Sequence, residues 1–117
     1  VGVTILTSLN ENNLVELGFN SSAEEIAIKL AKLGKQNGVD GVVCSIEDIS
    51  GIKASLGGDF LSVTPGVRMS QDNDDQKRSG SIYNAIQFGT DFVVVGREIT
   101  QAKNPEGVLK KIESLIV

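Results

Sequence analysis

The chain has 117 residues, enough for one domain with a modest core. Its 40% apolar and 22% charged residues are typical of a globular domain, and no apolar run approaches the ~18 residues needed to cross a bilayer. The net charge of −4 argues against general binding of nucleic acid. The absence of His and the single Cys exclude histidine chemistry, histidine metal ligands and an internal disulfide.

The first residues contain an apolar stretch, but no basic segment precedes it and no cleavage-type site follows it. Together with the single Cys, this predicts a cytoplasmic domain without a signal peptide, a membrane segment or a cofactor. The chain opens on Val1, at a point where the sequence predicts a strand. We therefore expect this start to be a cut, made in a gene, in an expressed fragment or by a protease.

Three segments, residues 3–7, 41–45 and 92–96, have the composition of buried parallel strands, because each is an apolar run rich in β-branched residues. A fourth strand is predicted over residues 60–64. It is expected to stop at Pro65-Gly66, a pair that starts a loop.

Helices are predicted between and after these strands. Ser22 followed by Glu25 is the signature of a capping box, and apolar residues then recur at helical spacing until Gly34 or Gly38 ends the helix. Three further helices are predicted over residues 46–56, 79–88 and 105–116.

The order βαβαβαβα predicts an α/β fold with a parallel sheet. Four such units make half of an eight-stranded TIM barrel, which typically needs ~250 residues. They also fit a small open sheet of the flavodoxin type. The pattern alone does not choose between these two folds.

Ligands bind at the carboxyl ends of the strands in both folds, so the residues that follow each strand are the candidate site. Gly66 and Gly96 allow backbone N–H groups to approach a ligand closely. Arg68 and Arg97 supply forked donors suited to phosphate oxygens, and Gln76 adds an uncharged donor. These residues predict a phosphate site.

The alternative is that both arginines are surface residues paired with nearby carboxylates: Arg97 with Glu98 or Asp91, and Arg68 with Asp72 or Asp74. The acidic loop after Arg68 weakens a phosphate site argued from charge alone. Thr7 and Ser45 are weaker candidates, since polar residues are common at strand ends. No cationic residue flanks Cys44, which we expect to be a buried structural thiol.

Five motifs occur in order along the chain: Val3-Thr4-Ile5-Leu6-Thr7-Ser8, Gly38-Val39-Asp40-Gly41-Val42-Val43-Cys44-Ser45, Val63-Thr64-Pro65-Gly66-Val67-Arg68, Asp74-Asp75-Gln76-Lys77-Arg78 and Val95-Gly96-Arg97-Glu98-Ile99-Thr100. In this order and spacing the sequence resembles the second half of bacterial orotidine 5′-phosphate decarboxylase, from Val3 to about Ile112. The resemblance implies that residues 1–117 are one partial domain, the C-terminal half of a TIM barrel. The N-terminal catalytic half would be absent from this chain.

The resemblance also implies roles for matching residues. Thr7 would contact the pyrimidine ring or the ribose, and Pro65 would lie at the edge of the nucleotide pocket. Four residues would surround the 5′-phosphate: Arg68, Gln76, Gly96 and Arg97. The loop around Gln76 would be the segment that closes over the substrate.

This sequence departs from the family pattern in two ways. The catalytic Asp-x-Lys-x-x-Asp motif is missing, because Asp75-Gln76-Lys77 is followed by Gly80 where the second Asp should stand. Three substitutions also fall near the phosphate residues: Met69 and Glu98 each replace a usual Pro, and Gly80-Ser81 replaces a usual Thr-Pro. Each of them could loosen the phosphate site.

The family implies a cofactor-free carboxy-lyase that converts orotidine 5′-monophosphate to UMP in pyrimidine biosynthesis, as a homodimer, with this segment inactive alone. A second hypothesis is a non-catalytic half-barrel that serves as a nucleotide-binding or assembly module. A third is a related barrel decarboxylase acting on a sugar phosphate, which the Thr7-Ser8 and Gln76 matches disfavour. Because half a barrel has open edges, we expect self-association or a non-covalent complementary half.

Overall fold

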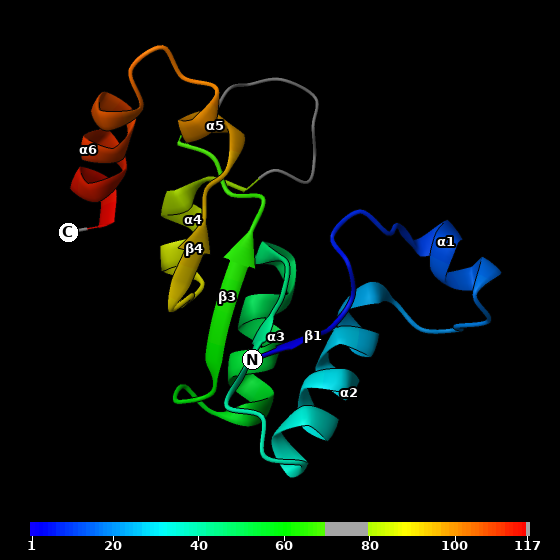
Figure 1. Ribbon diagram of the computed structural model, residues 1–117. Helices are drawn as coiled ribbons and strands as arrows, with labels where there is room; N and C mark the ends of the chain where they lie inside the picture. Colours follow the sequence, from blue (N-terminus) through cyan, green and yellow to red (C-terminus); the bar gives the residue numbers. More distant parts are fainter. Residues whose placement is uncertain (70–79, 117) are drawn as a thin grey trace.

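A computed structural model describes residues 1–69 and 80–116 of the chain (Figure 1). Its elements in order are β1 (Gly2–Val3), α1 (Glu11–Glu16), α2 (Ala23–Gln36), β2 (Gly41–Val43), α3 (Ile46–Leu56), β3 (Leu61–Pro65), α4 (Ile82–Gln87), β4 (Phe92–Val94), α5 (Arg97–Thr100) and α6 (Pro105–Ile116). The four strands form one parallel sheet in the order β1-β2-β3-β4. None of the helices in the described ranges has the length and apolar character of a membrane-spanning segment.

The strand order decides between the two folds that the sequence left open. Each strand pairs with its neighbours in the chain, and the order never reverses. A flavodoxin-like sheet reverses its order at a switch point, whereas a barrel adds its strands in sequence around a ring. The fold is therefore the predicted α/β fold, half of a TIM barrel.

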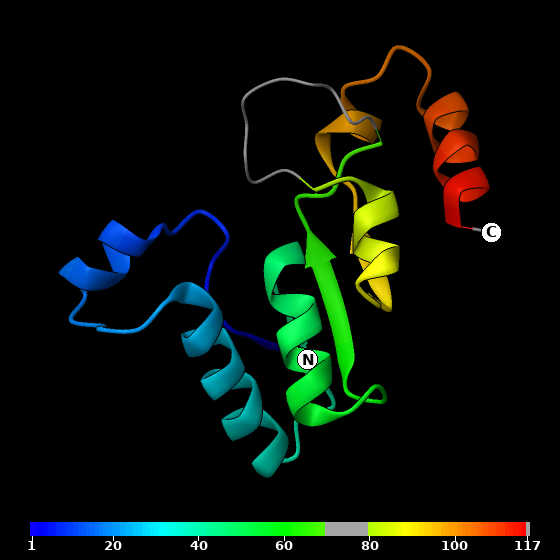
Figure 2. The same ribbon diagram turned by 180° about the vertical axis from the view of Figure 1, so that it is seen from behind.

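The sheet has one covered face and one open face. Val42 and Cys44 of the β2 segment are buried against the helices, which stand on the near side of the sheet when the molecule is seen from behind (Figure 2). The pairing register aligns an inner row on the opposite face: Val3, Val43, Val63 and Phe92. At the ends of this row Val3 is 63% exposed and Phe92 is 56% exposed. A row of apolar side chains thus lies open where a complete barrel would have its interior.

Two apolar clusters hold the helices to the covered face. The first joins α2 and α3 to β2 and is made of Ala31, Val42, Cys44, Ile49, Ile52 and Phe60. The second joins α4 and α6 beside β4 and is made of Val67, Ile82, Ala85 and Ile112. Because the loops at the strand ends emerge from these clusters, the clusters fix where the candidate site residues lie.

The predicted helices are largely confirmed. Ser22 and Glu25 form the expected capping box at the start of α2. Gly34 lies within α2, and the chain turns away at Gly38, whose φ of 84° suits glycine. The ranges of α3 and α6 match the prediction, whereas α4 begins only at Ile82, after its N-cap.

Three of the four predicted strands were too long. The first, expected over 3–7, pairs only at Gly2–Val3, because the N–H and hydroxyl groups of Thr4 both donate to the Val43 carbonyl and the chain then leaves the sheet. The strands expected over 41–45 and 92–96 both end two residues early, and the next helix begins three positions after the end of each strand. The strand expected over 60–64 is shifted by one residue and includes Pro65.

Two short helices were missed. α1 begins at a capping box in which Asn10 and Asn13 exchange side-chain and backbone bonds. α5 follows β4 directly, with Gly96 as its N-cap. The Asn-x-x-Asn spacing was visible in the sequence, but it lacks the Glu or Gln of the usual motif.

Asp91, directly before β4, forms an ion pair with Lys53 of α3 and hydrogen bonds with Ser62 of β3. Lys53 Nζ lies 2.6 Å from Asp91 Oδ2 and also donates to the Phe60 carbonyl oxygen at 2.7 Å. The same carboxylate accepts the Ser62 N–H at 2.7 Å and its hydroxyl at 3.1 Å. Burial alone would raise the pKa of Asp91, but the bonds from Lys53 and Ser62 outweigh it and hold the pKa below its ordinary value of 3.8.

We expect Asp91→Asn to lower the free energy of unfolding by about 1–2 kcal/mol, because the partly exposed pair is broken and Lys53 loses its counter-charge. Urea unfolding at pH 7 measures this change, and Asp59→Asn at an exposed site is the matched control with the same loss of charge. A lowered carboxyl pKa stabilises the fold above pH 3.8, and this stabilisation is lost as the pH falls through the lowered pKa. The difference between wild type and Asp91→Asn should therefore shrink in acid; equal stability of the two proteins at pH 7 would contradict the assignment.

Candidate functional site

An open cleft of about 1630 Å³ lies at the carboxyl ends of the strands. Its walls come from the loops that follow all four strands and from the helix starts beside them. The predicted site residues within the described ranges all line it: Thr7, Pro65, Arg68, Gly96 and Arg97. Gln76, the remaining predicted residue, lies outside the described residues. The structure therefore brings together five residues that are spread over 90 positions of sequence, from 7 to 97.

The turn after β3 carries Arg68 to the cleft. Pro65 ends the strand, and Gly66 follows with a φ of 72°, which glycine adopts without strain. The backbone of Arg68 is then fixed on one side, since its N–H donates to the Gly80 carbonyl oxygen and its own carbonyl accepts the Ile82 N–H at 2.9 Å. The side chain of Arg68 is left exposed at the cleft.

Arg97 reaches the same cleft from the next strand. It is the first residue of α5, directly after Gly96, and its side chain is exposed. The neighbouring Glu98 is half-buried, and its carboxylate accepts the N–H of Met69 at 3.1 Å. This bond joins the loop after β3 to the helix after β4, so the two arginines belong to one local structure.

The charge of the cleft is mixed. Arg68 and Arg97 are the cationic side chains among its described lining residues, against five carboxylates: Glu11, Glu24, Glu47, Asp48 and Glu98. The arginines lie on the β3 and β4 side, whereas all the carboxylates except Glu98 belong to helices near β1 and β2. An anion would therefore be favoured on the β3 and β4 side only.

The alternative that the two arginines form surface ion pairs can be tested for Arg97. Asp91 pairs with Lys53 at the opposite end of the sheet, so the alternative that Asp91 pairs with Arg97 is wrong. Within residues 1–69 and 80–116, Lys53–Asp91 is the single ion pair, so Arg97 does not pair with Glu98 either. Asp72 and Asp74, the partners considered for Arg68, lie outside the described residues.

Comparison with known proteins identifies the family to which the chain belongs. The model of the family described as Orotidine 5′-phosphate decarboxylase / HUMPS matches residues 1–112. The chain belongs to this family. The resemblance inferred from five motifs is thereby confirmed.

Curated relatives agree in both sequence and extent. The chain is 43% identical over 114 residues to an orotidine 5′-phosphate decarboxylase of Neisseria meningitidis serogroup A, covering 96% of this chain and 46% of that protein. It is 46% identical over 113 residues to the enzyme of that name from Vibrio parahaemolyticus, covering 96% and 48%. The chain thus spans about half the length of the curated relatives it matches.

Solved structures show the same relation. The crystal structure of orotidine 5′-phosphate decarboxylase from Lactobacillus acidophilus superposes with a TM-score of 0.80 at 33% identity, covering 97% of this chain and 46% of that one. A conserved protein from Geobacillus kaustophilus superposes with a TM-score of 0.76 at 31% identity and the same coverage. The half-barrel described above is therefore the fold that family members have over the matched segment.

Among the cleft residues that were not predicted from the sequence are Asp48, Asn84 and Gln101. Asp48 is notable because it is a carboxylate only 5% exposed, in the first turn of α3, where negative charge is favourable. The sequence could have identified Asp48 as a candidate site residue, because it lies two residues after Cys44-Ser45-Ile46, which follows a buried strand. Asn84 and Gln101 carry no sequence signal, because helical periodicity alone does not show which polar residue faces a cleft.

Cys44 is the buried thiol that the sequence predicts. Burial, and then the nearby charge of Asp48, raise the pKa of the Cys44 thiol from 9.0 to about 11, although a hydrogen bond with Thr64 opposes them. The side chain packs in the α2–α3 cluster rather than in the cleft. It is therefore placed as a core residue and not as a nucleophile.

We expect Cys44 in the folded protein to react with iodoacetamide at pH 8 at least about a hundredfold more slowly than an ordinary thiol, because only the thiolate reacts and its fraction falls tenfold for each unit of pKa. Mass spectrometry of the alkylated protein follows the reaction. The same protein in concentrated urea is the control and should be labelled at the ordinary rate. Fast labelling without denaturant would show that Cys44 is accessible.

Proposed function

We propose that this chain is the phosphate-binding half of an orotidine 5′-monophosphate decarboxylase, the enzyme that converts this nucleotide to UMP and CO₂ in pyrimidine biosynthesis. The observation that carries the proposal is the meeting of Arg68 and Arg97 at one side of one cleft, each placed by the loop after its strand. Membership of the family and the names of its curated relatives support the substrate.

In this proposal each site residue has a separate task. Arg68 and Arg97 hold the 5′-phosphate through charge-assisted bonds, with Gly96 giving its oxygens close access to the backbone. Gln76 adds an uncharged donor from the loop after Arg68. Thr7, on the far side of the cleft, contacts the ribose or pyrimidine, and Pro65 borders the pocket. The binding energy of the 5′-phosphate contributes to the reaction at the distant carbon, because it holds the nucleotide in place.

The chemistry itself belongs to the other half of the protein. The chain has no Asp-x-Lys-x-x-Asp motif, and we propose that residues 1–117 are one partial domain completed by an N-terminal half that carries it. The complete enzyme would be cytoplasmic and homodimeric, and would use no cofactor. Alone, this segment should bind UMP without decarboxylating orotidine 5′-monophosphate, which an absorbance assay of the nucleotide would detect.

A second candidate function is a non-catalytic nucleotide-binding or assembly module. The open inner row favours it, because an apolar face of this kind tends to associate with another surface. The two candidates share the same phosphate site and differ in whether a catalytic half completes the barrel.

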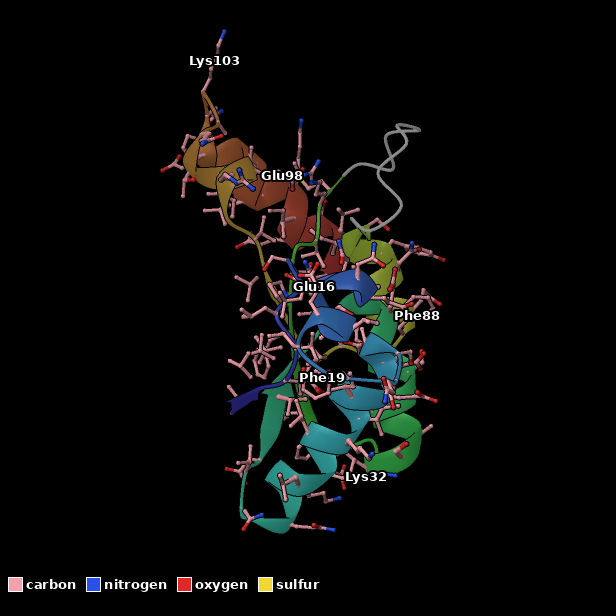
Figure 3. The ribbon with its side chains drawn as sticks, turned by 90° about the vertical axis from the view of Figure 1, so that its right-hand side faces the viewer. Glu16, Phe19, Lys32, Phe88, Glu98 and Lys103 are labelled. Atoms are coloured by element: carbon pink, nitrogen blue, oxygen red, sulfur yellow. The ribbon has the colours of Figure 1, made fainter. Side chains whose placement is uncertain are left out.

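We expect Arg97→Ala to weaken UMP binding about ten- to a hundredfold, because a hydrogen bond between two charged groups contributes about 1.5–3 kcal/mol. Isothermal titration of the chain with UMP measures this change. Lys103→Ala is the matched control, since Lys103 carries the same charge on the α5–α6 connection and extends away from the rest of the molecule (Figure 3).

Arg68→Ala should weaken UMP binding similarly, and inorganic phosphate should compete with UMP in wild type. Equal affinities of wild type, Arg97→Ala and Lys103→Ala would reject the phosphate site. Loss of binding in both single-charge variants would show that only the overall charge matters.

We expect the isolated chain to form dimers or larger species, because β1 and β4 leave free edges and the inner row is open. Light scattering after size-exclusion chromatography gives the mass. Replacing Phe92 by Ser, in the inner row, should shift the distribution towards monomer, whereas the same change at Phe19, outside the sheet, should not. A monodisperse monomer with no second chain present would contradict this expectation.

A further inference from the structure

One hydrogen bond connects the two arginine-bearing loops. The N–H of Met69 lies 3.1 Å from Glu98 Oε2 and 3.4 Å from Oε1, across 29 residues of sequence. Arg68 directly precedes Met69, and Arg97 directly precedes Glu98. The bond thus joins the residue after one arginine to the residue after the other.

We propose that Glu98 is a positioning residue that holds Arg68 and Arg97 at the spacing needed to bind one phosphate. The inference rests on the proposed function, because it assigns Glu98 a task at that site. Glu98 itself does not touch the phosphate; it acts on the backbone of Met69 through its carboxylate.

The surroundings of Met69 show why this bond matters. On the α4 side, the Arg68 backbone already bonds to Gly80 and Ile82. Towards α5, the Met69 N–H donates to the Glu98 carboxylate. α5 is four residues long, and Ile99 packs only partly buried against the α4–α6 cluster. Met69 and Val95 also pack, partly buried, against this cluster, and Glu98 adds a directional contact to the apolar packing.

Met69 and Glu98 were expected from the sequence to be separate substitutions that could each loosen the phosphate site. The structure joins them as the two partners of one hydrogen bond, in which the Met69 N–H donates and the Glu98 carboxylate accepts. A proline at position 69 would have no N–H to donate.

The Glu98 carboxylate also has an effect that opposes phosphate binding, because its negative charge lies beside Arg97 and repels a phosphate. A fair test must separate charge from hydrogen bonding. Glu98→Gln and Glu98→Ala both remove the charge, but only Gln keeps an oxygen that accepts the Met69 N–H. Met69→Pro removes the donor and leaves Glu98 in place.

The experiment measures UMP affinity of the full chain by titration, together with exchange of the Met69 amide hydrogen by NMR. We expect Glu98→Ala to bind UMP about three- to tenfold more weakly than Glu98→Gln, the effect of one lost hydrogen bond. The Met69 amide should exchange faster in Glu98→Ala than in Glu98→Gln. In the Met69→Pro background the difference in affinity between Ala and Gln at position 98 should vanish. Circular dichroism confirms that each variant is folded.

The outcomes separate this inference from the proposed function. If Arg97→Ala loses UMP but Glu98→Ala binds as tightly as Glu98→Gln, or more tightly, the phosphate site stands and the positioning role is overturned. If the Ala and Gln variants still differ in the Met69→Pro background, Glu98 acts by another contact and the proposal is also overturned. If wild type and Arg97→Ala bind UMP equally weakly, the phosphate site itself fails, and the role of Glu98 fails with it.

Discussion

Parallel pairing without any reversal of strand order is the constraint on which the rest of this structure depends. It places all four carboxyl ends at one edge, so loops that are far apart in sequence open into a single cleft. It also places the helices on one face, because each crossover connection has the same hand. The site and the open inner row are two results of the same topology.

Local signals in the sequence predicted local structure well. The Ser22–Glu25 box marks the start of α2 because both bonds lie within four residues of the chain. The extent of β1 could not be predicted in this way, because strand pairing depends on a neighbour almost 40 residues away at Val43. An apolar β-branched run shows that a strand is possible, but the partner decides where it stops.

The candidate site also has features that the sequence predicts and features that depend on contacts between distant residues. The arginines and glycines were predictable, since residues after parallel strands face the ligand edge in any α/β fold. The hydrogen bond between Met69 and Glu98 was not predictable, because neither sequence motif indicates that these two residues lie close together. The alternative that Asp91 pairs with Arg97 was wrong, because Asp91 pairs with Lys53 at the end of the sheet opposite to Arg97.

The inner row has a consequence for how this gene segment can change over time. Val3, Val43, Val63 and Phe92 share one level because the register fixes their heights. Side chains alternate between the two faces of a strand. Deleting one residue at the start of β3 would therefore turn Ser62 and Thr64 towards the inner row and Val63 towards the helices. Substitutions in the row alter one side chain, whereas a frame-preserving deletion moves every later side chain of that strand. Length variation should therefore accumulate in the loops of this family and be purged from its strands.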